Sequence, residues 1–169
     1  MPNTKRVLAA TLVLAGCSGI GGQPVPYGLI QVELTEPLTI PAGSAHATFQ
    51  AGRQVGGVNR YSPWCELEIQ TVSEEPQRVE PTGIAVGRVG QAFIRDYNTR
   101  MPALIGGLSC NDLVFRETTW WMGPESGSRV LYLRCFAPYT NCIFGPPLSP
   151  EQIQEVVGPG IDIRVANRL

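Results

Sequence analysis

Positive charge is scarce in this chain, and lysine is nearly absent. Charged residues make up 16% of the 169 residues, and no lysine follows Lys5. No run of basic residues occurs, so the chain lacks the clustered positive charge that binds the phosphates of nucleic acids. We therefore expect no nucleic-acid partner and no electrostatic attachment to anionic lipid.

Long apolar runs and familiar catalytic motifs are also missing. The apolar run 7–14 is far shorter than the roughly 20 residues that a membrane-spanning helix needs, and no later segment comes close. His46 is the only histidine, and neither a Gly-x-Ser-x-Gly nor a Ser-x-x-Lys motif occurs. The glycines of 52–57 lack the Lys-Ser/Thr ending of a phosphate-binding loop. These absences predict no spanning helix, no enzymatic activity, no cofactor and no metal site.

Glycine and proline are plentiful, with 19 and 15 residues, which favours short strands and turns over helices. Apolar and polar residues alternate in 29–35 and again in 65–72, as in half-buried strands. In the second segment Cys65, Leu67 and Ile69 are expected to point inward, and Glu66 and Glu68 outward to solvent. Further short strands are expected at 38–40, 45–50, 84–89, 92–94, 113–122, 130–136 and 161–165.

One helix is expected near the C-terminus. Ser149 is a typical N-cap, Pro150 suits the first helical position, and Gln152 completes a capping box. Ile153, Val156 and Val157 would share one face of this helix, and Gly158 can end it. The pattern as a whole predicts a mainly β domain, an antiparallel sandwich or partly open barrel with one short C-terminal helix.

The N-terminus has the order of a secretory signal: Lys5 and Arg6, then the apolar run 7–14, then small residues. Leu14-Ala15-Gly16-Cys17 resembles the lipobox of bacterial lipoproteins. The resemblance implies a signal peptide at 1–16 and acyl chains, including palmitate, on Cys17. Ser18 favours the outer membrane, with the inner membrane as the alternative. A cleaved signal with a chance cysteine, or an uncleaved apolar N-terminus, would also fit the pattern.

Cleavage before Cys17 would leave a flexible Gly- and Pro-rich tether at 17–28 and a single β-rich periplasmic domain at 29–169. The remaining cysteines are Cys65, Cys110, Cys135 and Cys142, an even number that points to two disulfides in an exported chain. Three pairings are open. We favour Cys65–Cys135, which lie in apolar strand patterns, and Cys110–Cys142, which lie in loops. A metal site or reactive thiols are the alternatives, although no Cys-x-x-Cys occurs.

Few residues stand out as functional candidates. The pair Trp120 and Trp121 must point to opposite faces of a strand, so one of them is a candidate contact for an envelope protein or a glycan. Glu66 and Glu68 offer paired carboxylates for a glycoside hydrolase, but alternation makes a solvated face the simpler interpretation. His46 is expected to be a hydrogen-bonded strand residue. The other candidates considered are Tyr61, Trp64, Arg116, Arg129 and Asp162.

The segments 37–43 and 61–68 resemble a group of uncharacterised envelope lipoproteins of proteobacteria, and this resemblance implies a location and disulfides but no activity. The leading hypothesis is a lipid-anchored binding or scaffolding module without catalytic activity. The alternative is an envelope hydrolase or carbohydrate-active enzyme that uses the outward carboxylates. A small-ligand or metal chaperone is disfavoured by the single histidine and few methionines.

Overall fold

Alternation between apolar and polar residues produces the main sheet. The computed structural model describes residues 30–96, 101–103, 112–123, 127–139, 143 and 145–166. Within these residues the elements are, in order, β1 (Ile30–Leu34), β2 (Leu38–Ile40), β3 (His46–Gln50), β4 (Arg53–Val55), β5 (Trp64–Ile69), β6 (Gln77–Val79), β7 (Thr82–Asp96), β8 (Met101–Pro102), β9 (Phe115–Met122), β10 (Val130–Pro138), α1 (Pro150–Val157) and β11 (Ile161–Val165). The chain is therefore mainly β with one short helix near the C-terminus, as predicted.

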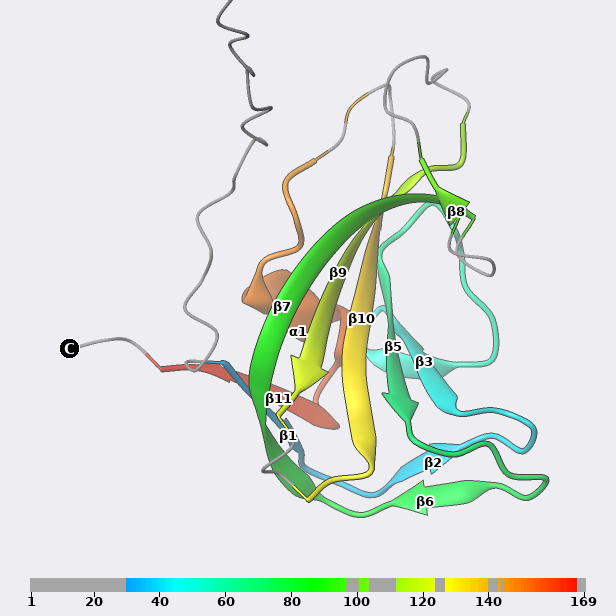
Figure 1. Cartoon of the computed structure of the whole chain (residues 1–169), viewed down its shortest axis with the longest axis vertical. Coiled ribbons are helices and arrows are strands. Elements are labelled where there is room, and N and C mark those ends of the chain that lie inside the picture. Colours follow the sequence, from blue (N-terminus) through cyan, green and yellow to red (C-terminus); the bar gives the residue numbers. More distant parts are fainter. Residues whose placement is uncertain are drawn as a thin grey trace, which may run out of the picture.

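Nine of the described strands form one curled, antiparallel half-barrel sheet (Figure 1). Its strand order is β11-β1-β7-β9-β10-β5-β3-β4, with β8 pairing with the end of β7, while β2 and β6 form a separate two-stranded sheet. The long strand β7 bends across the sheet, because its first part pairs with β1 and the rest pairs with β9. The sheet is thus the partly open barrel among the predicted alternatives.

The larger core lies between one face of the sheet and α1. Ile30, Val32 and Leu34 of β1 belong to it, as do Ile153 and Val157 of α1. The helix begins with the predicted capping box: Gln152 N–H donates to the Ser149 hydroxyl, and Ser149 N–H donates to the Gln152 side chain. Burying the apolar stripe of α1 supplies the packing that so short a helix needs.

Some boundaries differ from the sequence-based predictions. The segments 84–89 and 92–94 are one strand, β7, with a register shift near Gly87 in its pairing with β9. Strand β9 begins at Phe115 and not at Leu113. Strands β4 and β6 are absent from the predicted strands, because they are defined by pairing with a neighbouring strand, which outweighs weak local propensity.

Several predictions fall outside the described residues. These concern the signal at 1–16, lipidation of Cys17, the tether at 17–28 and the Cys110–Cys142 bridge. Within the described ranges, no helix is long and apolar enough to cross a membrane.

Candidate functional site

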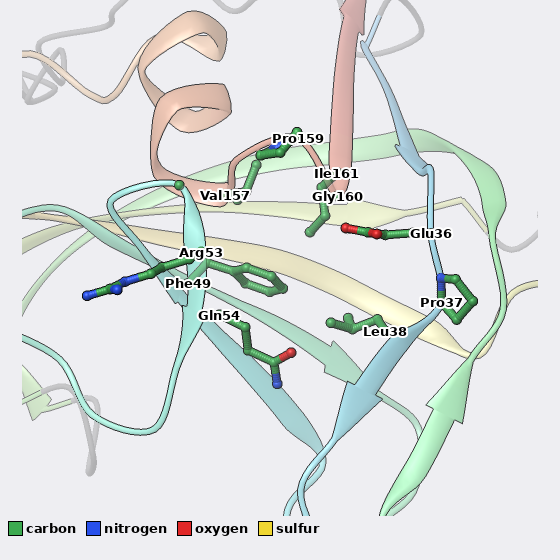
Figure 2. Close-up of a pocket in the computed structure, with 11 residues that line it drawn as sticks. Glu36, Pro37, Leu38, Phe49, Arg53, Gln54, Val157, Pro159, Gly160 and Ile161 are labelled. Carbon is green, nitrogen blue, oxygen red and sulfur yellow. The ribbon is translucent and has the colours of Figure 1, made fainter.

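A groove of about 260 Å³ opens where three segments distant in sequence meet: the β1–β2 corner, the β3–β4 hairpin and the α1–β11 connection (Figure 2). Its floor consists of the buried side chains of Leu38, Phe49, Val157 and Ile161. Its rim is formed by Glu36, Pro37, Arg53, Gln54, Pro159 and Gly160. We call this feature the hairpin groove. Its apolar floor and few polar rim groups are typical of a binding site.

The turn of the β3–β4 hairpin packs directly on the end of α1. Gly52 N–H donates to the Val156 carbonyl over 3.1 Å. A Cβ at Gly158 would overlap the carbonyl of Gly52, and the φ of Gly158 is 79°, so glycine is required at this position. The hairpin and the helix therefore form one rigid side of the groove.

Hydrogen bonds fix the other sides. Thr35 N–H donates to the Gly160 carbonyl over 3.1 Å, and the Thr35 hydroxyl donates to the Pro159 carbonyl over 2.9 Å. The Gln54 amide donates to the Thr39 carbonyl over 2.8 Å, which joins β4 to β2. Since its walls are held before anything binds, the hairpin groove is preorganised.

One carboxylate and one guanidinium line the hairpin groove, and they point in different directions. The Glu36 carboxylate points toward Gly160, whereas the Arg53 guanidinium points away from the groove (Figure 2). Glu36 makes no ion pair with any residue that the structure describes. The C-terminal end of α1 also lies at the groove, and its last turn carries no basic residue. A helix C-terminus carries partial negative charge, so both features favour a cation.

The carboxylates considered for catalysis lie elsewhere, on the sheet face opposite the larger core. Directly paired residues across five strands form a row on this face: Arg88, Trp121, Tyr132, Glu68 and His46. A second row contains Gly90, Thr119, Arg134, Glu66 and Thr48. We call this surface the polar face. It brings together four candidates from the sequence, Glu66, Glu68, Trp121 and His46.

The prediction that Glu66 is solvated is wrong, because the polar face is covered at this point. Glu66 is only 6% exposed, and Arg134 lies directly opposite it at 7% exposure. The two side chains form an ion pair over 2.7 Å, and Arg134 also lies 3.9 Å from Glu68. One guanidinium therefore serves both carboxylates, which keeps Glu66 engaged in a structural ion pair.

Arg134 remains charged despite its burial. Desolvation alone would lower the pKa of Arg134, but the hydrogen bond and negative charge of Glu66 outweigh it. Tyr132 and Glu117 act in the same direction, so the pKa lies above its ordinary value. Glu117 is itself buried and accepts a hydrogen bond from the Thr119 hydroxyl over 2.9 Å. These contacts give the centre of the polar face the character of a buried ionic network.

The tryptophan pair is divided between the two faces, as alternation predicts. Trp120 is 3% exposed and belongs to the larger core, so it cannot reach a partner without unfolding. Trp121 is half-buried on the polar face, where its ring fills the space that a Cβ at Gly90 would need. The Arg88 guanidinium lies 3.9 Å from its ring centroid and covers it. A sugar could stack on this side of Trp121 only by displacing Arg88.

The other aromatic candidates are dispersed, whereas His46 lies on the polar face. Trp64 is fully buried, stacks on Phe136 and contacts the edge of Phe115, whereas Tyr61 is 73% exposed. His46 lies opposite Glu68, and the hydrogen bonds of its backbone with the Ser44 hydroxyl hold it in place.

The charged candidates are engaged within the domain. Arg116 donates to the Gly145 carbonyl and to Gln91. Arg129 donates to Thr71 and Gln77, which joins the end of β5 to β6. Asp162 accepts from Arg164 on the same strand. None of these three residues lines the hairpin groove.

The disulfide predicted between Cys65 and Cys135 is present. The two residues are directly opposite each other on β5 and β10, with their Cα atoms 4.0 Å apart, and both side chains are buried in the larger core. Among the described residues, no group of three or more His, Cys, Asp or Glu side chains is arranged to hold a metal ion.

No local sequence pattern indicated the hairpin groove. Glu36 and Gln54 were not among the candidate residues, and only tertiary packing brings them to one rim. Comparisons with known family models, curated proteins and solved structures found no match for the chain.

Proposed function

We propose that this chain is an exported, lipid-anchored cell-envelope protein whose β domain is a binding module without catalytic activity. The hairpin groove carries the binding part of the proposal, because it combines an apolar floor, a preorganised rim and an exposed carboxylate. The engagement of Glu66 by Arg134 supports binding over hydrolysis, since a carboxylate held in an ion pair is a poor proton donor.

The proposed location is the outer membrane, with the domain facing the periplasm. The lipobox-like Leu14-Ala15-Gly16-Cys17 and the following Ser18 support it. The buried bridge between Cys65 and Cys135 adds support, because disulfides persist mainly in oxidising compartments. Two or three acyl chains on Cys17 would make attachment durable where one would be marginal. An envelope protein or a glycan is the expected partner, and Trp121 is its candidate contact on the polar face.

Replacement of the lipidated cysteine tests this proposal. Cys17→Ser should release the protein from the membrane fraction or leave it unprocessed, and it should abolish labelling by a palmitate analogue. Ser18→Ala, which keeps the cysteine, is the matched control and should remain membrane-bound and labelled. Unchanged anchoring and acyl labelling of Cys17→Ser would refute the lipoprotein assignment.

A further inference from the structure

We propose that the hairpin groove binds a lysine or arginine side chain from an extended segment of a partner protein. This inference deepens the proposed binding function and rests on it. It concerns the chemistry of one groove, whereas the membrane assignment concerns Cys17, so the two can fail separately.

The size and lining of the hairpin groove suit one long basic side chain. Its volume of about 260 Å³ is below the roughly 300–1,000 Å³ typical of small-molecule sites. The ring of Phe49 and the side chain of Leu38 provide an apolar floor, and the Glu36 carboxylate lies at the edge of this floor (Figure 2). Lysine and arginine bury an apolar stem while the charged head stays near water, which matches this arrangement.

Two separate sources of negative charge select for a cation. One is the Glu36 carboxylate, whose Oε1 lies 2.9 Å from the position that a Cβ on Gly160 would take. The other is the C-terminus of α1, whose last turn has no basic residue, although its Val156 carbonyl already accepts a hydrogen bond from Gly52 N–H. The rim cation Arg53 points out of the groove and forms no ion pair with Glu36 (Figure 2).

The position of β4 favours a protein segment over a free ion or amine. β4 is an edge strand of the nine-stranded sheet, since it pairs only with β3 among the described strands. Two of its residues, Arg53 and Gln54, line the groove. An extended segment that adds to the edge of β4 would deliver a side chain to the rim. A bare metal ion is disfavoured, because one carboxylate above a carbon floor provides few oxygen ligands.

Peptide titration of the isotope-labelled, full-length protein in detergent tests the proposal. The probes are acetyl-Val-Lys-Val-amide, the same peptide with norleucine in place of lysine, and free 1,5-diaminopentane. Binding of each probe is measured from the NMR chemical-shift changes of the Gly52, Gln54 and Gly160 amides. We expect the lysine peptide to shift these amides and to bind about fivefold more tightly than the uncharged norleucine peptide. Equal affinity of those two peptides, or shifts confined to other residues, would overturn the proposal. If diaminopentane bound as tightly as the lysine peptide or more tightly, the proposal would also be overturned, because the groove would then be a site for free amines.

Three variants make the test specific. Glu36→Gln should weaken the lysine peptide about fivefold and leave the norleucine peptide unchanged. Gly160→Ala should have a similar effect, because the new Cβ displaces only the end of the flexible Glu36 side chain and leaves the fold intact. Glu75→Gln removes an exposed carboxylate remote from the groove and should change nothing. Loss of binding in Glu75→Gln, or full binding in Glu36→Gln, would contradict the assignment.

Discussion

The two faces of strand β5 are both buried, but they are stabilised in different ways. On one face Cys65, Leu67 and Ile69 enter the larger core, where the disulfide and apolar contacts hold them. On the other face Glu66 is equally shielded but depends on the charge of Arg134. Alternation therefore predicts which residues share a face, and it does not predict whether that face meets solvent.

This difference separates two kinds of contribution to stability. The apolar face gains from removing carbon from water, which needs no particular partner. The polar face must recover the cost of desolvating ions, so each residue there depends on a specific neighbour. The loss of stability caused by a substitution on the polar face should therefore depend on which charged neighbours remain, whereas the loss on the apolar face should not.

The largest effect is expected from removing the bridge on the apolar face. The double change Cys65→Ala/Cys135→Ala should lower the free energy of unfolding by about 4 kcal/mol, because the bridge closes a loop with a sequence separation of 70 residues. Urea denaturation of the oxidised protein measures the change, and the wild-type protein treated with reductant is the matched comparison. A loss below about 1 kcal/mol would mean that packing, and not the bridge, stabilises this face.

A comparable but asymmetric effect is expected on the polar face. Arg134→Met should cost about 3–5 kcal/mol, because it leaves Glu66 without its cation and removes the charge near Glu68. Glu66→Leu should cost less, since Arg134 keeps its interactions with Glu68 and Glu117. Denaturation of both variants provides the measurement. Equal costs would show that the guanidinium serves Glu66 alone.

The smallest effect is expected at the start of α1, on the apolar side of the sheet. The pKa of Glu151 is lowered by its hydrogen bond with Ser149 and then by its own backbone N–H. A lowered pKa in the folded state stabilises the protein above the unfolded pKa, and this contribution is lost as the pH falls through the folded pKa.

Glu151→Gln should therefore lower the melting temperature slightly at pH 7. The difference from wild type should shrink below the ordinary glutamate pKa of about 4.3 and vanish below the lowered pKa of the folded state. Thermal denaturation across this pH range measures it. Glu155→Gln, later in the same helix, is the control. A difference that persisted at low pH would indicate a packing effect and not the carboxylate charge.

Local patterns were sufficient for several features of the fold. The Ser149–Gln152 capping box predicted the start of α1, and alternation in 29–35 and 65–72 predicted β1 and β5. The pairing of Cys65 with Cys135 followed from their places in two apolar strand patterns. The strands, the helix start and the inward direction of each cysteine depend on the spacing of residues within one segment, which the sequence displays directly.

The features that carry the proposed function could not be derived in this way. Nothing in the segments of Glu36, Gln54 and Gly160 indicates that they meet at one rim, because the contacts between them link residues far apart in the chain. The short strand β4 was missed for the same reason, since pairing with β3 defines it.

Periodicity and local hydrogen-bonding chemistry were enough to predict the mainly β character, the capped C-terminal helix and the inward positions of Cys65 and Cys135. The burial of Glu66 against Arg134 and the hairpin groove arise from packing between segments far apart in the chain. The spacing of a residue assigns it to a face, whereas the curl of the whole sheet decides what covers that face.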